Sequence, residues 1–288
     1  MFDFSNAIEE INTYGGSEKK KTLVFEGKRY LVKFPDPIRA KNKSISYINN
    51  AYSEFIGSHI FSLCGFNTQK TYLGNYLYKD KYKVICACED FTDKDHALYE
   101  FEKLALSSNP NKKIETEISD IISVLEESNQ LIKISNIKEY FWNMFIIDAL
   151  IGNTDRHNGN WGFILNKISN SFEISPIYDC GSCLFPLLSD DDISKLTDGE
   201  IKNIAINTHS CLKEDNSKIN YMPYIESMNN SNINDALIRV FPNIDIIKIN
   251  DFINSIECIS DLRKNFYTRI INIRYEILRN VYEKLKQN

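Results

Sequence analysis

The segment LIGNTDRHNGNWGFIL, residues 150–165, decides which fold this sequence predicts. An apolar run ends at Gly152, eight mostly polar residues follow, and an apolar, strand-like run begins after them. The polar part contains Asp155 and, five residues later, Asn160. Such a segment is either an ordinary surface turn or a loop that holds a metal ion and a phosphate group.

The spacing of Asp155 and Asn160 is the Asp-x-x-x-x-Asn pattern of a phosphoryl-transfer loop. In that chemistry the aspartate orients the attacking hydroxyl and accepts its proton. The asparagine offers an amide oxygen to Mg²⁺, which prefers hard oxygen ligands. On its own, a pattern this short is more often a polar turn between a helix and a strand.

A second motif, SPIYDCGSCL, places Asp179 nineteen residues after Asn160. This aspartate follows a strand-like run, FEISPIY, and precedes Gly181 in an Asp-x-Gly turn. In kinases the aspartate of such a turn binds the metal ion that bridges the nucleotide phosphates. The two motifs together place two carboxylates and an amide in this order, each at a strand edge. This arrangement favours a nucleotide-dependent phosphotransferase over a protein in which the two motifs are unrelated turns.

The first quarter of the chain adds a third motif. Residues 22–34, TLVFEGKRYLVKF, predict a β-hairpin, because two β-branched and aromatic runs flank a Glu-Gly-Lys turn. The preceding turn, YGGSEKKK, has backbone N–H groups that suit phosphate oxygens. Lys33 ends the second strand, and Glu54 lies 21 residues later on a helix predicted over residues 47–64. This order suits a lysine that contacts phosphates and a glutamate that positions the lysine.

The remaining pattern separates a β-rich start from a helical remainder. Residues 71–91 predict two more strands, whereas residues 115–130, 137–152 and roughly 250–287 predict helices. The composition changes at residues 89–95, EDFTDKD, which we take as the boundary between two lobes. The C-terminal helix is expected to bury one apolar face, made of Leu262, Phe266, Ile270, Ile273, Ile277 and Val281.

The composition is that of a globular protein, with 288 residues of which 43% are hydrophobic. A net charge of −5 argues against a nucleic-acid-binding protein. No apolar run is long enough for a transmembrane helix, and the start, MFDFSNAIEE, is not a signal peptide. Seven cysteines without an export signal indicate reduced thiols. We therefore expect a cytoplasmic protein that binds neither nucleic acid nor membranes directly.

The motifs GNTDRHNGNWGFIL and SPIYDCGSCLF resemble those of the HipA-like serine/threonine kinases of bacteria, especially the stand-alone forms. The resemblance covers roughly residues 12–188. It implies an α+β, two-lobed protein-kinase-like fold, with a small β-rich, ATP-binding lobe carrying one helix over residues 1–91 and a larger, mainly helical lobe over residues 92–288. It also implies ATP- and Mg²⁺-dependent transfer of the γ-phosphoryl group to a protein serine or threonine, with autophosphorylation.

The resemblance assigns roles to individual residues. It implies that Asp155 is catalytic and that Asn160 and Asp179 hold Mg²⁺. The residues it implies at the nucleotide are Tyr14, Gly15, Gly16, Ser17, Glu18, Lys19, Lys33, Glu54, Glu89, Asp90, Phe91, His157, Asn160, Tyr178 and Asp179.

Two departures from the family pattern stand out. Cys180 replaces the phenylalanine of Asp-Phe-Gly, and only 14 residues precede Gly15, where the full toxin has a subdomain that docks its antitoxin. A separate antitoxin or regulatory protein stays open as a partner.

Three other interpretations compete with this one. The Asp-Arg-His-x-x-Asn pattern also resembles phosphoinositide-type lipid kinases, but those present a basic segment to membranes, and LSDDDISKLTDGE, residues 188–200, is acidic. That acidity favours a protein acceptor and suits a basic acceptor site. A pseudokinase that acts as a binding module is the second alternative. Zinc at Cys180 and Cys183 is the third, and a single Cys-x-x-Cys pair is weak evidence for it.

Overall fold

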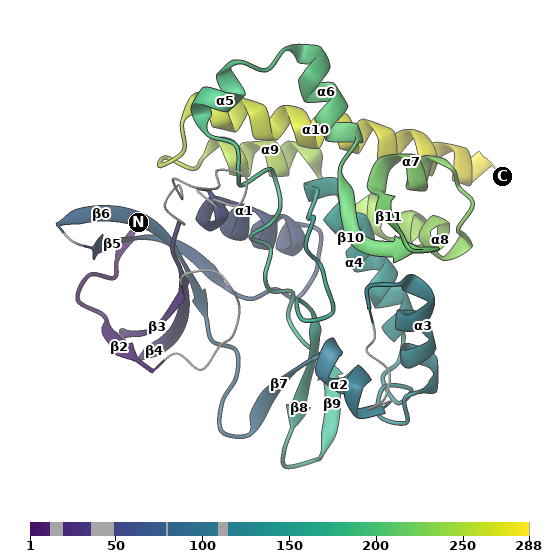
Figure 1. Cartoon of the computed structure of the whole chain (residues 1–288), viewed down its shortest axis with the longest axis horizontal. Helices are drawn as coiled ribbons and strands as arrows, with labels where there is room; N and C mark the ends of the chain where they lie inside the picture. The colour runs from purple at the N-terminus through teal and green to yellow at the C-terminus, as the bar shows by residue number, and fades with distance from the viewer. Residues whose placement is uncertain (12–19, 36–48, 79, 109–114, 288) are drawn as a thin grey trace.

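The computed structural model describes residues 1–11, 20–35, 49–78, 80–108 and 115–287 and shows a molecule with two lobes (Figure 1). A curled β-sheet with one helix forms the N-terminal lobe. The rest is mainly helical and carries two small sheets. The α+β, two-lobed fold predicted from the sequence is therefore confirmed. The two chain ends lie on opposite sides of the molecule in Figure 1.

The N-terminal sheet has six strands in the order β1-β5-β6-β4-β3-β2. All neighbouring strands are antiparallel except β1 and β5. The predicted hairpin is confirmed: β3 and β4 pair from Lys20 with Lys33 to Phe25 with Lys28. Its turn has positive φ at Glu26 and Gly27, which a glycine adopts at little cost. The strands are β1 (Phe2–Asp3), β2 (Ile8–Glu10), β3 (Lys20–Phe25), β4 (Lys28–Lys33), β5 (Thr71–Tyr78) and β6 (Lys81–Glu89).

Helix α1 (Asn50–Leu63) packs against β5 and β6. It is the helix predicted over residues 47–64, and it ends before Gly65, whose φ of +88° lies in the left-handed region. Ile56, Ile60 and Phe61 are fully buried on the face that meets the core. This packing gives the residues of α1 fixed positions relative to the end of β4.

The C-terminal lobe is built around α4 (Ile137–Ile151), one of the helices predicted from the sequence. Helix α4 is apolar almost all round, so it is stable only with neighbours on every side. Its neighbours include α8 and the long helix α10. The other helices are α2 (Phe101–Ser108), α3 (Ile118–Glu127), α5 (Asp190–Ser194), α6 (Asp198–Ile206), α7 (Tyr221–Glu226), α8 (Ser231–Val240), α9 (Ile246–Asn254) and α10 (Asp261–Gln287).

The C-terminal region differs from its prediction in two ways. Residues 250–287 form parts of two helices, α9 and α10, rather than one. The expected buried face was also wrong at Leu262, which is 41% exposed, whereas Arg263 and Arg274 are buried. Both arginines find hydrogen-bond acceptors far away in the sequence, at Leu188 and Ala205 respectively, and hydropathy alone does not reveal these partners.

Two smaller sheets complete the lobe. Strands β7 (His96–Glu100), β8 (Gly162–Asn166) and β9 (Ser171–Ile174) form one, and β10 (His209–Glu214) and β11 (Ser217–Asn220) form a hairpin. The strand predicted before Asp179 is shorter than FEISPIY: it ends at Ile174, and Ile177 makes only an isolated bridge with Thr68. That bridge ties the chain before Asp179 to the N-terminal lobe.

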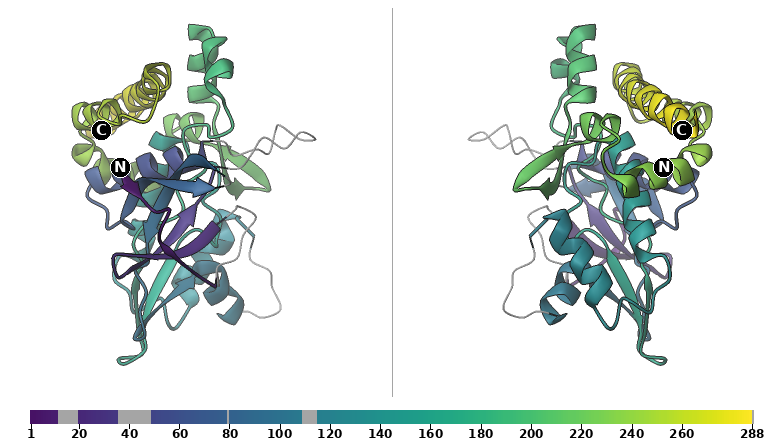
Figure 2. Two further views of the ribbon diagram at one scale, coloured as in Figure 1. Left: turned by 90° about the vertical axis from the view of Figure 1, so that its left-hand side faces the viewer. Right: turned by 90° about the vertical axis from the view of Figure 1, so that its right-hand side faces the viewer.

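Figure 2 shows α5 and α6 standing out at one end of the molecule and the β8–β9 hairpin at the opposite end. The segment of α5 and α6 is held to α10 by packing contacts of both helices. In the part of the chain that the structure describes, no helix combines the length and the apolarity needed to cross a membrane.

Candidate active site

A buried ion pair joins the end of β4 to the middle of α1. The Lys33 ammonium lies 2.6 Å from a carboxylate oxygen of Glu54, and the two side chains are 3% and 0% exposed. Charges removed from water are costly unless they are paired, so each side chain fixes the position of the other. The structure therefore brings together the lysine and the glutamate that the sequence singled out.

The same lysine contacts Asp179. Lys33 Nζ lies 2.5 Å from Oδ1 of this aspartate. Burial alone would raise the pKa of the Asp179 carboxyl, but the charge and hydrogen bond of Lys33 outweigh burial and lower that pKa to about 2. Asp179 is therefore an anion at neutral pH and suits a bound cation.

Helix α1 also packs directly against the loop that follows Asp179. The second carboxylate oxygen of Glu54 accepts a hydrogen bond of 3.1 Å from the backbone N–H of Cys180. Three residues after Glu54, Gly57 has no room for a side chain. A Cβ there would lie 2.7 Å from Cys180 Cβ and 2.9 Å from Cys183 Sγ. The glycine thus allows the close approach through which Glu54 holds both β4 and the Asp179 loop.

The polar loop between α4 and β8 takes its shape from the end of α4. Gly152 ends that helix with a φ of +64°, in the left-handed region. The side-chain amide of Asn153 donates to Asp148 at 2.9 Å, and its oxygen accepts the backbone N–H of Asp155 at 3.2 Å. These bonds fix the point at which Asp155 enters the loop.

Arg156 links this polar loop to the Asp-x-Gly loop. Its guanidinium, 1% exposed, makes two hydrogen bonds to the Asp148 carboxylate at 2.9 and 3.0 Å. It also donates to the backbone oxygen of Asn160 at 2.7 Å and to that of Tyr178 at 2.5 Å. Because a guanidinium offers five donors in one plane, a single side chain holds both loops in register.

Sequence reasoning assigned no role to Arg156 or Asn153. Their shared partner, Asp148, lies within the apolar stretch of α4, 1% exposed. An aspartate inside such a stretch is the signal that was available, since a buried carboxylate requires a partner. The spacing alone does not identify the partner, because the helix ends and the chain turns between the two.

Asp155 is half-buried at the edge of this network. Burial raises the pKa of its carboxyl; His157 opposes this, and the nearby anion of Asp179 raises the pKa further. A carboxylate with a raised pKa accepts a proton more readily near neutral pH. The position is therefore chemically suited to a residue that takes a proton from an attacking hydroxyl.

Asn160 and Asp179 supply the kinds of donor atom that Mg²⁺ takes. The side-chain nitrogen of Asn160 donates to the backbone oxygen of Asp155 at 2.7 Å, which leaves the amide oxygen as the group able to bind a cation. Among the described residues, no group of three His, Cys, Asp or Glu side chains could hold a metal ion. Mg²⁺ commonly binds through one or two protein groups together with substrate phosphates, and this pair fits that mode.

Three more of the predicted residues gather around Gly159. Its backbone N–H donates to Nδ1 of His157 at 3.0 Å, and its carbonyl oxygen accepts from the Tyr178 hydroxyl at 3.2 Å. The Tyr178 ring lies 6.0 Å from the ring of Phe91, measured between centroids. The structure therefore places an aromatic group from both lobes next to the polar loop.

The side chains of Glu89 and Asp90 do not join this group. Glu89 forms an ion pair with Lys28 at 3.1 Å, and Asp90 accepts hydrogen bonds from the backbone and hydroxyl of Thr92. A nucleotide contact from either residue would have to come from its backbone. The predicted glycine turn, residues 14–19, lies outside the described residues.

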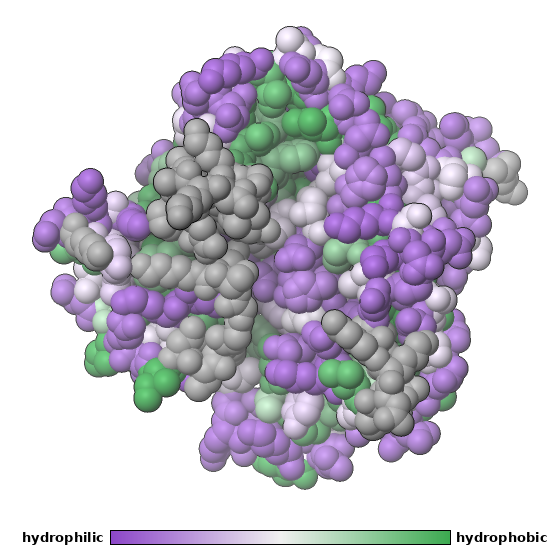
Figure 3. Space-filling view, in the orientation of Figure 1, coloured by the Kyte–Doolittle hydropathy of each residue, from purple (hydrophilic) through white to green (hydrophobic). Residues whose placement is uncertain are grey.

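A hollow of about 530 Å³ opens beside Asp155. Its lining comes from the polar loop, from Phe185, from the end of α6 and from the β10–β11 hairpin, where it includes His209 and Lys218. Figure 3 shows apolar surface gathered between α5 and α6 on this face of the molecule. Asp155 thus forms part of the wall of a hollow whose lining is mostly polar.

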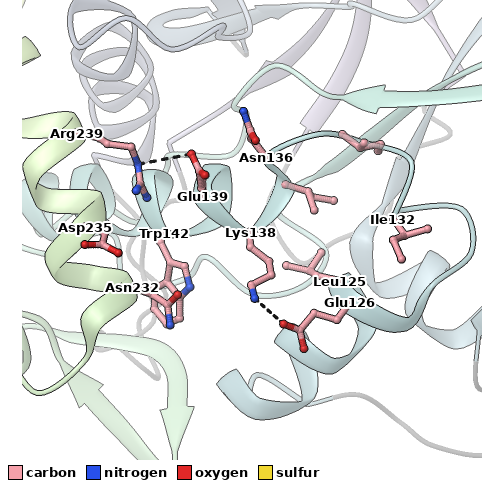
Figure 4. A pocket seen from close by; sticks show the side chains of 12 residues that line it. Leu125, Glu126, Ile132, Asn136, Lys138, Glu139, Trp142, Asn232, Asp235 and Arg239 are labelled. Carbon is pink, nitrogen blue, oxygen red and sulfur yellow. Dashed lines mark hydrogen bonds and ion pairs between the residues drawn. The ribbon is translucent and has the colours of Figure 1, made fainter.

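A second hollow, of about 510 Å³, lies between α3, α4 and α8 (Figure 4). Ion pairs between Lys138 and Glu126 at 2.5 Å and between Arg239 and Glu139 at 3.8 Å occupy its rim. It contains none of the residues that the sequence predicted at the site. We therefore assign the chemistry to the hollow beside Asp155.

A curled β-sheet lobe over a helical lobe, with this cluster of lysine, glutamate and aspartates between them, defines a phosphotransferase of the protein-kinase type. Comparison with known proteins agrees. The model of the HipA-like C-terminal domain matches residues 13–221. The serine/threonine-protein kinase CtkA of Helicobacter pylori is 35% identical over 269 residues, which cover 91% of this chain and 81% of that protein.

Solved structures give the same result. The crystal structure of the Helicobacter pylori proinflammatory kinase CtkA aligns with a TM-score of 0.88 at 33% identity, over 99% of this chain and 98% of that chain. A chain of the Shewanella oneidensis MR-1 complex of HipA, HipB and operator DNA aligns with a TM-score of 0.54 at 14% identity, over 96% and 66% of the two chains, which shows a shared fold.

The chain therefore belongs to the HipA-like family, as its two motifs predicted. It is a phosphotransferase of the serine/threonine protein kinase class.

Proposed function

We propose that this protein transfers the γ-phosphoryl group of ATP, in the presence of Mg²⁺, to a serine or threonine hydroxyl of a protein and also modifies itself. The observation that supports this most is the position of Lys33. One buried ammonium lies within 2.6 Å of Glu54 and within 2.5 Å of Asp179, although the three residues come from distant parts of the chain. A structural ion pair would need only one of these carboxylates.

Lys33 is the residue we assign to the nucleotide phosphates. Glu54 neutralises it and holds it at the end of β4, so its ammonium is positioned before ATP arrives. Asp179 and Asn160 would hold Mg²⁺, which neutralises charge on the phosphates as the transfer proceeds. The adenine side of the nucleotide is assigned to the group of Phe91, Tyr178 and His157. The turn of residues 14–19 is assigned to the phosphates, through its backbone N–H groups.

Asp155 is assigned to the acceptor hydroxyl. It lines the hollow through which an acceptor side chain can approach, and burial raises its pKa. It therefore orients the hydroxyl towards the γ-phosphorus and accepts its proton as the new P–O bond forms, while the bond from the γ-phosphorus to the β–γ bridging oxygen breaks and ADP leaves. Arg156 acts through position alone, because it holds the Asp155 loop against the Asp179 loop.

The test is phosphoryl transfer from labelled ATP to the protein itself and to a set of serine and threonine peptides. We expect the wild type to transfer phosphate only with Mg²⁺ present. Asp155→Asn should lose activity by about 10²- to 10⁴-fold while it still binds ATP. Equal transfer by the wild type and by Asp155→Asn would remove this assignment, and transfer only to phosphoinositide vesicles would replace a protein acceptor with a lipid.

A further inference from the structure

The hollow beside Asp155 has one lysine in its lining. Lys218 on β11 lines it and is exposed. Asp155 is the one carboxylate among the lining residues that the structure describes. The other polar side chains of the lining are the amides of Asn203 and Asn207, the hydroxyls of Thr154 and Thr208, and the imidazole of His209. An acceptor segment that enters the hollow therefore meets the Lys218 ammonium on the side of the β10–β11 hairpin and Asp155 on the side of the polar loop.

Lys218 is available to such a segment. Among the described residues, no carboxylate lies within ion-pair distance of its ammonium. On the same hairpin, Asp215 lies in the turn between the two strands, and the Glu214 carboxylate accepts a hydrogen bond of 2.6 Å from the Tyr224 hydroxyl. The lysine opposite on β10, Lys213, pairs instead with Glu115 at 3.0 Å. Of the two lysines in this hairpin, Lys218 is thus the one that lines the hollow, and it forms no ion pair with a described residue.

None of the acidic side chains of residues 188–200 is among the described residues that line the hollow. Asp190 pairs with Arg263 on α10, Asp191 pairs with Lys195, and Asp198 pairs with Arg269. Asp192 and Glu200 each accept hydrogen bonds at the start of a helix, as members of two capping boxes. These carboxylates are used within the chain, so the acidity of the segment does not by itself indicate a basic acceptor.

We propose that the acceptor serine or threonine is flanked by an anionic side chain, a carboxylate or a phosphate, which Lys218 binds. The inference rests on the proposed kinase function and deepens it, because it names the chemistry of the acceptor segment.

The test uses peptides with one fixed sequence around a serine and with Glu, phosphoserine, Gln or Lys at the positions next to it. Wild-type protein should phosphorylate the Glu peptide with a kcat/KM about fivefold above that for the Gln peptide. Its kcat/KM for the Lys peptide should be the lowest of the three. A phosphoserine peptide that exceeds the Glu peptide would identify previously phosphorylated segments as the acceptor. Equal rates on the two would show that a carboxylate suffices.

Lys218→Glu should reverse the preference, so that the Lys peptide becomes the better substrate and the Glu peptide the worse. Lys202→Glu is the matched control, because Lys202 is exposed on α6 and does not line the hollow. It should keep the wild-type order. Equal wild-type rates on the Glu and Gln peptides, or a preference for Glu that survives Lys218→Glu, would overturn the inference.

The kinase function and the role of Lys218 can be refuted separately. Transfer to the Gln peptide that Asp155→Asn abolishes supports the kinase function whatever the preference. If wild-type protein transfers phosphate but shows no preference for the Glu peptide over the Gln peptide, that result counts only against the role of Lys218. Absence of transfer to every peptide and to the protein itself, from wild-type protein that binds ATP, counts against both.

Discussion

The cluster of Lys33, Glu54 and Asp179 and the hollow beside Asp155 place their charges in different ways. In the cluster, the lysine and the glutamate are almost fully buried, and all three charges contact an opposite charge within the chain. In the hollow, Lys218 is exposed and faces a space that another molecule can enter. Buried pairing fixes geometry before any substrate binds, whereas an exposed charge is balanced by the substrate. Changes in the cluster should therefore affect every substrate, and changes in the hollow should affect the choice among substrates.

Arg156 provides the largest expected effect, because it is the most deeply buried charge that supports the cluster. Arg156→Met leaves Asp148 as an unpaired buried carboxylate, so the free energy of unfolding should fall by about 3–5 kcal/mol. Urea unfolding measures this. Arg239→Met is the control, since Arg239 is 36% exposed and its ion pair with Glu139 is 3.8 Å long. The control should lose no more than about 1 kcal/mol.

A double variant separates the lost pair from lost packing. Arg156→Met combined with Asp148→Leu removes both charges and should recover part of the stability that Arg156→Met loses. If Arg156→Met is no less stable than Arg239→Met, the claim that this arginine holds the two loops together is wrong.

Gly57 gives a smaller effect that combines stability and activity. In Gly57→Ala the new methyl group would overlap Cys180 and Cys183, which should cost about 1–3 kcal/mol and push α1 away from the Asp179 loop. We expect kcat to fall on all peptides together. Gly199→Ala in α6 is a matched control, because nothing lies within 4 Å of its Cβ position. Equal activity of the two variants would show that the close approach is not needed.

The same contrast explains how much the sequence could predict. Lys33, Glu54, Asp155 and Asp179 follow one another in the order expected for a phosphotransferase of this kind, and the structure brings the lysine, the glutamate and the second aspartate into contact. The hairpin, α1 and α4 could be predicted from local patterns because their turn and cap glycines are local signals.

The rest depends on contacts that no local pattern specifies. The hollow takes Phe185, Asn207 and Lys218 from separate segments, so it exists only after the lobe has folded. Arg274 was missed as a buried residue because its partners, such as the backbone oxygen of Ala205, are supplied by the end of another helix. Leu262 was assigned to the core because hydropathy does not show which side of α10 meets its neighbours.

The smallest expected effect is a shift in pH dependence. Burial raises the pKa of Asp155, and this residue must be ionised to accept a proton, so activity should fall with acidity at a pH above the ordinary aspartate value of about 3.9. Asp179, with a pKa of about 2, stays ionised over that range.

The charge of Lys218 lowers the pKa of Asp155. Lys218→Gln should therefore move the acidic limb of kcat/KM to higher pH, by less than about one unit. An acidic limb that moves to lower pH in Lys218→Gln, or that moves by the same amount in the control Lys202→Gln, would contradict this prediction.

One set of rates tests the central claim most directly: kcat/KM on the Glu and Gln peptides for the wild type, Glu54→Gln and Lys218→Glu. Glu54→Gln, which leaves Lys33 misplaced, should lower both rates by the same factor, of about 10- to 100-fold, without changing their ratio. Lys218→Glu should invert the ratio while transfer to the Gln peptide persists. Full activity of Glu54→Gln would contradict the division between a fixed catalytic cluster and an open acceptor hollow. A Glu-to-Gln peptide ratio that changes in Glu54→Gln but not in Lys218→Glu would contradict it as well.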